Sequence, residues 1–166
     1  AKNLPASIEF TPLADDRYVA ACRHDHPLAR KTHLSWQAYF EQDYIGLDRV
    51  SGNRTLLDRE LAHLTPARPS ICETRHVTTM LGMVEAGIGI AAVPAMSMPA
   101  GEHSVLRAVP LTDPVVTRTV GLIRLSGRIQ SYVAAELEKL IIEKAGLWLD
   151  SGAIFGVDGE GFERFN

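Results

Sequence analysis

Two polar turns in this sequence carry the residue types best suited to binding a small anion. Residues 48–54 follow an apolar segment of strand length, and residues 74–79 follow another. Each turn leads into a segment whose apolar residues recur at helical spacing, so each places free backbone N–H groups where a strand passes into a helix. Helix N-termini at such positions favour anionic groups. An alternative stays open here, because Ser51, Asn53 and Thr74 are also common N-cap residues.

A metal site is the second chemistry that the side chains suggest. His24 and His26 are two residues apart, the spacing that points side chains to one side of a strand. A third ligand would have to be Asp25 or His33, and neither spacing is typical of a zinc or non-haem iron site. The sequence therefore favours exposed turn histidines beside Pro27, and it predicts neither a metal nor a cofactor.

Catalysis has little support in the sequence. Ser51-Gly52 lacks the preceding glycine of a nucleophile elbow, and Cys72 lies in an apolar segment where a cysteine is usually an inert side chain. Gly87-Ile88-Gly89 follows a predicted helix and precedes a predicted strand, which is the reverse of the order in a dinucleotide-binding loop. We therefore expect that the protein is not an enzyme.

The elements that must position the two turns alternate between strand and helix. Apolar spacing predicts helices over 34–40, 53–64, 76–86 and 128–144. Strands are predicted over 8–13 and 17–22, joined by a hairpin-like turn at Asp15-Asp16, and over 44–47, 69–73, 88–93, 105–109 and 116–125. This alternation indicates an α/β fold built from βαβ units. Residues 146–166 show no period and are expected to form an extension of poorly defined structure.

The composition excludes several classes of protein. Hydrophobic residues make up 46% of the 166 residues and charged residues 22%, which is typical of a globular domain and not of a disordered or fibrous chain. The net charge of −3 argues against a nucleic-acid-binding surface within these residues. No apolar stretch approaches the roughly 18 residues of a membrane span, and the 2 cysteines are too few for a disulfide framework. We therefore expect a soluble, cytoplasmic domain.

Four segments together resemble a known family. They are HPLA at 26–29, LSWQAYF at 34–40, VEAGIGIAAVP at 84–94 and RTVGLIR at 118–124. Their order and spacing are similar to those of the effector-binding domain of LysR-type transcriptional regulators, over about residues 8–145. The resemblance implies two Rossmann-like lobes of the type 2 periplasmic-binding-protein fold. It also implies that a small molecule, frequently an organic anion, binds between the lobes and changes how a tetramer binds promoter DNA.

The resemblance also implies how the chain divides. Residues 1–29 are expected to supply first-lobe strands and a crossover, and residues 30–118 a complete second lobe. Residues 119–145 are expected to form the other crossover strand and a first-lobe helix, followed by the extension 146–166. The family's helix-turn-helix and the opening part of its first lobe have no counterpart in these residues. We therefore expect a regulator truncated at its N-terminus, which would bind DNA only through the absent domain.

The ligand site that the resemblance implies combines a strand end with the two polar turns. Its residues are Arg23, Val50, Ser51, Asn53, Arg54, His76, Thr78 and Thr79. We expect Ser51 and Asn53 to hydrogen-bond a polar group of the ligand, with one of the two threonines opposing them. Arg23 or Arg54 would pair with a carboxylate, and His76 would add a charge that responds to pH.

The expected partners are the effector and further copies of the chain, as a homodimer or tetramer. With part of a lobe missing, sheet edges and apolar helix faces would be uncovered, which favours association. The alternative from another class is a solute-binding protein of a transport system, which shares the fold.

Overall fold

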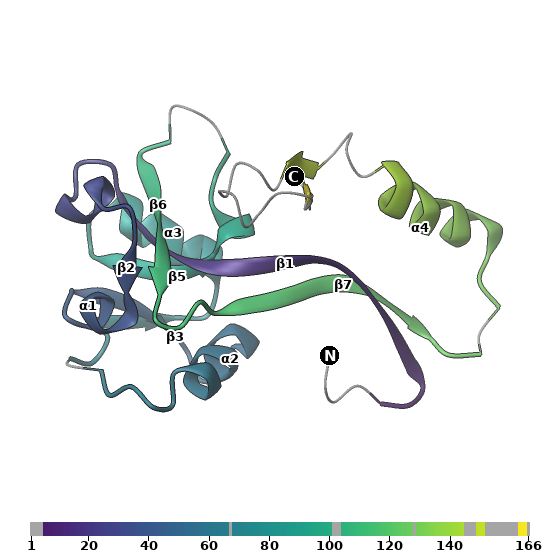
Figure 1. Cartoon of the computed structure of the whole chain (residues 1–166), viewed down its shortest axis with the longest axis horizontal. Helices are drawn as coiled ribbons and strands as arrows, with labels where there is room; N and C mark the ends of the chain where they lie inside the picture. The colour runs from purple at the N-terminus through teal and green to yellow at the C-terminus, as the bar shows by residue number, and fades with distance from the viewer. Residues whose placement is uncertain are drawn as a thin grey trace. The chain divides into compact units, whose positions relative to one another are not determined.

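The computed structural model describes residues 5–66, 68–100, 104–127, 129–144, 149–151 and 163–165. They belong to two compact units (Figure 1). One is Arg17–Thr117, and the other combines Ala1–Asp16 with Arg118–Asn166. The two polar turns lie in the first of these units, which is therefore described first.

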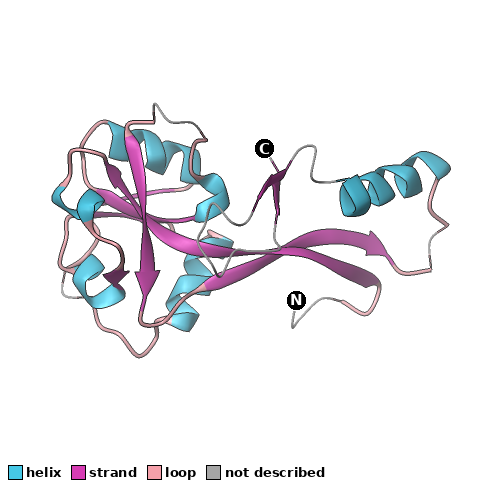
Figure 2. Cartoon of the chain, turned by 45° about the horizontal axis from the view of Figure 1, so that its top comes forward, coloured by secondary structure: helices cyan, strands magenta, loops and turns pink. Residues whose placement is uncertain are grey.

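The unit Arg17–Thr117 is a mixed sheet with helices packed beside its strands (Figure 2). Its strands are the second part of β1 (Ile8–Arg23), β2 (Leu34–Ser35), β3 (Tyr44–Leu47), β4 (Cys72–Thr74), β5 (Ile90–Pro94) and β6 (Leu106–Thr112). Its helices are η1 (Pro27–Arg30), α1 (Trp36–Phe40), α2 (Gly52–Glu60), α3 (Val77–Glu85) and η2 (Ala95–Ser97). The alternation confirms the predicted α/β class.

The strand order in this unit is β2-β6-β1-β5-β3-β4. β3 pairs in parallel with β4 and β5, whereas β1 runs antiparallel to β5 and β6. The connection from β3 to β4 through α2 and the connection from β4 to β5 through α3 lead in opposite directions along the sheet. Because such crossovers are right-handed, α2 and α3 lie on opposite faces of the sheet.

The larger hydrophobic core lies on the face covered by α1 and α2. Alternate residues of β1, namely Tyr18, Ala20 and Cys22, are buried in it together with Trp36 and Tyr39 of α1. The period of two along a strand sends the intervening β1 residues to the α3 face. The position of every β1 side chain in this unit is therefore fixed by strand register.

Local capping explains where α1 begins. Ser35 is its N-cap, and the Ser35 hydroxyl accepts a hydrogen bond of 3.2 Å from the Ala38 N–H. Leu34 and Ser35 form the short strand β2 instead of the predicted first turn of the helix, because Leu34 pairs with Leu111 of β6. Trp36 is then held by its indole N–H, which donates to the Pro114 carbonyl at 2.9 Å.

Most other elements lie close to the predicted ranges. β3 has the predicted bounds, and α3 is shorter than predicted by one residue at each end. α2 ends at Glu60 instead of residue 64, because the chain turns at Leu61 to His63. These elements are set by local apolar spacing, which is visible in the sequence.

The predicted hairpin turn at Asp15-Asp16 is wrong, because β1 is one strand from Ile8 to Arg23. Aspartate is uncommon inside strands, but both side chains have donors on the neighbouring strand. The Asp15 carboxylate accepts a hydrogen bond of 2.7 Å from the Thr119 hydroxyl. The Asp16 carboxylate accepts from Arg118 Nε at 3.0 Å and Nη2 at 2.9 Å. Long-range pairing thus replaces the turn.

The division of the chain also differs from the predicted one. The units meet at Asp16/Arg17 and at Thr117/Arg118, whereas the sequence analysis places the first boundary after residue 29 and the second after residue 118. Residues 18–23 pair with β5 and β6 on both sides, so they form part of the Arg17–Thr117 sheet. The chain therefore passes between the units in the middle of β1.

In the other unit, the first part of β1 pairs with β7 (Thr117–Leu125). The Arg124 guanidinium lies 2.6 Å from the Glu9 carboxylate near the far end of the pair, which matches antiparallel neighbours. α4 (Tyr132–Lys144) begins later than predicted, with the Ser131 hydroxyl accepting from the Ala134 N–H at 3.3 Å. Most of the predicted extension 146–166 lies outside the described residues. Its two described segments are the strands β8 (Leu149–Ser151) and β9 (Glu163–Phe165), which pair antiparallel.

Candidate functional site

The candidate site lies at the edge of the sheet where β3, β4 and β5 end. These strands are parallel, so their carboxyl ends meet at one edge. β3 and β5 are neighbours whose outgoing connections leave in opposite directions, and ligands of open α/β sheets bind at such a switch point. β1 runs the other way, and its Tyr18 pairs with Pro94 at the end of β5. The start of β1 in this unit therefore lies at the same edge.

The N-terminus of α2 is the first component of this carboxyl-edge site. Ser51 is the N-cap of α2 but makes no capping hydrogen bond with its side chain. A Cβ added at Gly52 would meet no atom within 4 Å, so the helix start is open. Asn53 is held in place, because its side-chain oxygen accepts a hydrogen bond of 2.9 Å from the buried Tyr18 hydroxyl. No side-chain cap from Ser51 thus covers this helix start, where an anion is favoured.

The N-terminus of α3 is the second component. His76 is its N-cap, also without a capping hydrogen bond from its side chain. Thr78 and Thr79 follow in the first turn, and all three side chains are exposed. Val50, in the turn before α2, is 74% exposed. Seven of the eight predicted residues thus lie in these two turns, and both helix starts leave their N–H groups without a side-chain cap.

Arg54 is at this edge, but its charge is already neutralised. Its guanidinium donates to Asp58 at 2.7 Å, to Glu73 at 3.3 Å and to the Leu47 carbonyl at 2.9 Å. The hydrogen bond to Asp58 is the main reason that the pKa of Arg54 is raised. These contacts join α2 to β3 and β4. The pairing of Arg54 with a ligand carboxylate stays a prediction.

Asp48 brings a negative charge to the same edge. Its Oδ2 accepts a hydrogen bond of 3.3 Å from Arg75 Nε, while Oδ1 is buried without a donor among the described residues. The Asp48 N–H donates to the Thr74 carbonyl at 3.0 Å, which joins the two turns directly. Arg75 therefore offsets a carboxylate that would otherwise repel an anionic ligand.

Arg23 is not brought together with the other predicted residues. It ends β1, and because β1 is antiparallel to β5 it lies at the opposite edge of the sheet. Its guanidinium pairs with Asp25 at 2.7 Å and donates to the Glu85 carbonyl, at the last residue of α3, at 3.0 Å. Arg23 thus binds the C-terminus of α3, whereas the predicted ligand contacts are at its N-terminus.

Arg17 is the residue that the sequence analysis missed. It directly precedes Tyr18, the residue that pairs with Pro94. By alternation it shares the α3 face of the sheet with Val19. Arg17 forms no ion pair with a described residue, so its charge is available at the edge where Arg23 was expected to act. The signal that could have identified it is the direction of β1, which the apolar pattern alone does not reveal.

The histidines have local structural contacts. The His24 ring Nδ1 lies 3.1 Å from the Val105 carbonyl, and the His26 ring Nδ1 accepts from the Leu28 N–H at 3.2 Å. Within the described part of the chain, no three His, Cys, Asp or Glu side chains are grouped so that they could hold a metal ion.

None of the described helices combines the length and the apolar character needed to cross a bilayer.

The chain belongs to the LysR substrate-binding domain family, whose model matches residues 2–146. It is 41% identical over 145 residues to YbhD of Escherichia coli strain K12, an uncharacterised HTH-type transcriptional regulator, covering 87% of this chain and 45% of that protein. The chain thus spans about half the length of the curated relatives it matches. The family is one of regulator domains and not of enzymes, and it favours a regulator over a transport solute-binding protein.

Solved structures show the same fold. The effector-binding domain of QuiR in complex with shikimate has a TM-score of 0.69 at 23% identity, over 85% of this chain and 66% of that one. The BenM effector-binding domain with its effector benzoate has a TM-score of 0.65 at 23% identity, over 88% of this chain and 68% of that one. At these identities the similarity shows the fold, which is the α/β, type 2 periplasmic-binding-like fold of LysR effector-binding domains.

Proposed function

We propose that the chain binds a small organic carboxylate at the carboxyl-edge site, as the effector that regulates a LysR-type transcription factor. The observation that carries the proposal is the pair of helix starts, at Ser51 and His76, that lack a side-chain cap at the switch point of the sheet. Two helix starts without a side-chain cap, and with them two helix dipoles, would act on one anion. Arg17 supplies the unpaired positive charge that a carboxylate prefers.

The relatives support the same chemistry. Shikimate and benzoate, which are named in the QuiR and BenM structures, are both carboxylates. The predicted roles of Ser51, Asn53, Thr78 and Thr79 as hydrogen-bond partners of the ligand remain part of this proposal. Val50 is the neighbour whose exposed side chain contacts the apolar part of the ligand. His76, the N-cap of α3, would place its imidazole ring beside the ligand.

The proposal is tested by titration calorimetry with a panel of small carboxylates and aromatic acids. We expect at least one to bind, and we expect Ser51→Asp to weaken that binding by tenfold or more. The introduced carboxylate would cap α2 and occupy the position of the ligand anion. The same charge placed at another N-cap, in Ser35→Asp, should leave affinity within twofold, because α1 follows β2 at the far end of the strand order, with β6 and β1 between β2 and β5.

Two results would overturn the proposal. One is the absence of binding by any acid in the panel. The other is an equal loss of affinity in Ser51→Asp and Ser35→Asp, which would show that the effect is one of net charge and not of the α2 helix start. The thermal unfolding midpoint of each variant serves as the folding control.

The longer regulator is proposed to be a cytoplasmic, DNA-binding homodimer or tetramer. Self-association is supported by apolar side chains of the unit that contains β7 and α4, where Ile123, Ile129, Tyr132 and Val133 are exposed. Large apolar side chains left exposed on one unit favour association with another surface. DNA binding would reside in a helix-turn-helix domain, as the names of the relatives indicate.

A further inference from the structure

A cavity of about 450 Å³ lies under α2, next to the carboxyl-edge site. It is open to solvent on one side and is lined by residues of α1, α2, β3 and β4, by the segment that joins α2 to β4, and by Met80 of α3 and Ala92 of β5. Its volume is within the range of small-molecule sites in proteins. Of the eight predicted effector residues only Arg54 lines it, so the cavity is a separate feature of the same unit.

The inner wall of the cavity is aromatic. Trp36, Tyr39, Phe40 and Tyr44 line it and pack against one another, with ring centroids 5.2 to 6.0 Å apart for the pairs in contact. Their edge-to-face and tilted arrangement leaves ring faces and edges that favour a further aromatic ring at similar distances. The opposite wall is formed by leucines of α2 and of the turn after it, including Leu57 and Leu64.

Gly46 lets the segment after α2 lie against the sheet where both line the cavity. The register of β3 with β5 and β4 places Gly46 on the α2 face, beside Glu73. A glycine in a strand leaves room for a close approach by another group. A Cβ here would be 3.0 Å from the Ser70 hydroxyl, so the segment after α2 lies directly against this position. None of the nine residues of α2 itself is fully buried, which shows that the helix stands off the sheet.

One buried hydrogen-bond donor lies in the wall. The Tyr39 hydroxyl accepts a hydrogen bond of 2.9 Å from the Ala92 N–H, and Tyr39 is 2% exposed. The hydroxyl proton itself has no acceptor among the described residues. Burial raises the pKa of Tyr39, so the group stays protonated and remains a donor. A ligand with an oxygen or nitrogen acceptor would satisfy it.

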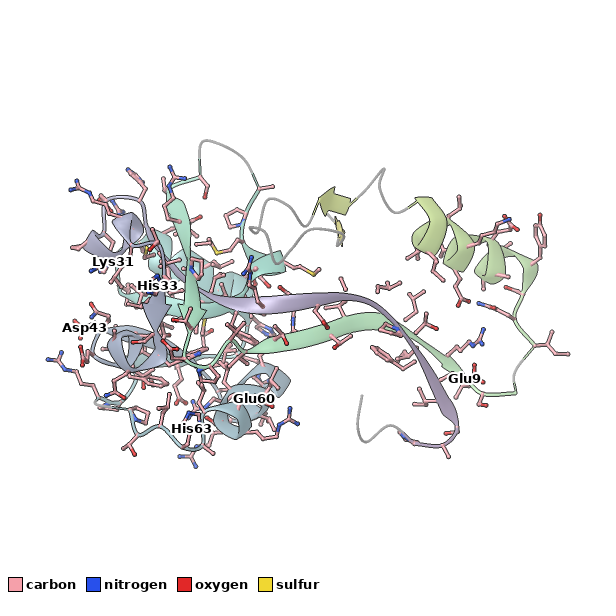
Figure 3. The ribbon with its side chains drawn as sticks, viewed as in Figure 1. Glu9, Lys31, His33, Asp43, Glu60 and His63 are labelled. Carbon is pink, nitrogen blue, oxygen red and sulfur yellow. The ribbon has the colours of Figure 1, made fainter. Side chains whose placement is uncertain are left out.

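The charged groups at the mouth are paired already. Arg54 is bound by Asp58 and Glu73. Arg68 lies 3.5 Å from Asp43, a residue labelled in Figure 3 at the start of β3. No described cation that lines the cavity is therefore free to neutralise an anion. The cavity favours an uncharged ligand, in contrast to the carboxyl-edge site.

We infer that the cavity under α2 is a second binding site, for an uncharged single-ring aromatic compound that carries a hydrogen-bond acceptor. The ring of the ligand would lie against the aromatic wall of the cavity, and its acceptor atom would accept a hydrogen bond from the Tyr39 hydroxyl. Arg54 lines this cavity and also holds the start of α2. A ligand in the cavity would therefore affect the position of the helix start that contributes to the carboxyl-edge site. The inference does not depend on an anion binding at that edge.

The test is an NMR titration of the whole chain with benzyl alcohol, which has the ring, the acceptor and no charge. The indole N–H of Trp36 is the reporter, and the Trp148→Phe variant assigns it, since the chain has 2 tryptophans. We expect a saturable shift of the Trp36 signal in the millimolar range. Leu57→Phe, which fills the cavity, should weaken binding by tenfold or more. Benzoate has a similar size but is anionic, and the Trp36 signal should report that it binds at least tenfold more weakly than benzyl alcohol.

The matched control is Leu56→Phe, on the same helix, since Leu56 packs against the core but does not line the cavity. It should leave affinity within twofold. If Leu57→Phe does not fold, Leu64→Phe fills the same space from the turn after α2. An unmoved Trp36 signal, equal loss in the filling and control variants, or a benzoate shift as strong as that of benzyl alcohol would each overturn the inference.

Discussion

Replacing Arg118 with methionine tests how much the ion pair between Arg118 and Asp16 stabilises the fold. The Asp16 side chain is 0% exposed, and its carboxylate accepts two hydrogen bonds from the Arg118 guanidinium, at 2.9 and 3.0 Å. Arg118→Met keeps the aliphatic stem but removes the cation. It therefore leaves a buried carboxylate without its arginine partner, which is far more costly than losing an exposed pair.

The size of the effect follows from the burial of the two partners. Removing one member of a buried ion pair costs about 3–5 kcal/mol. Arg118 is 32% exposed, so water offsets part of the loss and we expect the lower end, about 3 kcal/mol. This corresponds to a roughly 150-fold change in the unfolding equilibrium constant. With a urea m-value of about 2 kcal/mol/M, the midpoint should fall by about 1.5 M.

Urea unfolding monitored by circular dichroism measures this shift, and two further variants make the result decisive. Arg124→Met removes an exposed guanidinium from the same strand and should change the midpoint little. Asp16→Asn combined with Arg118→Met removes both charges and should be more stable than Arg118→Met alone. The reasoning would be refuted if Arg118→Met behaved like Arg124→Met, or if the double variant were no more stable than the single one.

Three further predictions concern glycines, cysteines and association. Gly89→Ala should destabilise the chain more than Gly87→Ala in the same urea assay, because a Cβ at residue 89 would lie 2.5 Å from the Asp43 carbonyl oxygen. Gly87→Ala has room for its Cβ and pays only the strain of an alanine at a φ of 78°. Iodoacetamide at pH 8 should label Cys72 and spare Cys22, whose pKa burial raises to about 11; equal labelling in mass spectra would contradict this. Light scattering at high micromolar concentration should show a homodimer, and a monomer would be the contrary result.

The parts of the fold that local spacing determines were predictable. α3 lies close to its predicted range because its buried residues Met80, Leu81 and Val84 recur at helical spacing. β3 has its predicted bounds, and its last three residues are buried consecutively, as in a strand covered on both faces. The cap of α1 was also visible, since Ser35 precedes the first apolar residue of the helix. Each of these signals depends on residues within one turn or one strand of each other.

β1 was mispredicted because its continuity depends on residues far away in the chain. Asp15 and Asp16 are local turn formers, and only their partners Thr119 and Arg118 make them suitable for a strand. Those partners are about a hundred residues further along the sequence. No window of local sequence contains both sides of these contacts.

The candidate site was predictable in its turns and not in its charges. Ser51 and His76 begin helices, as the sequence indicates. The neutralisation of Arg54 had a partial signal, since Asp58 lies at i+4 on the same helix. The presence of Arg17 and not of Arg23 at this edge had no such signal, because it depends on the direction in which β1 crosses the sheet.

The unbroken strand between the units restricts how this family member can change in length. β1 carries one alternation of side chains through the point where the chain passes from Asp16 to Arg17. Inserting or deleting a single residue there would move every later side chain of β1 to the other face of the sheet. Tyr18 and Cys22 would leave the core, and Arg17 would enter it. Changes of two residues would preserve the faces. Length variation at this position should therefore occur in even steps, a constraint that an ordinary loop between two domains does not impose.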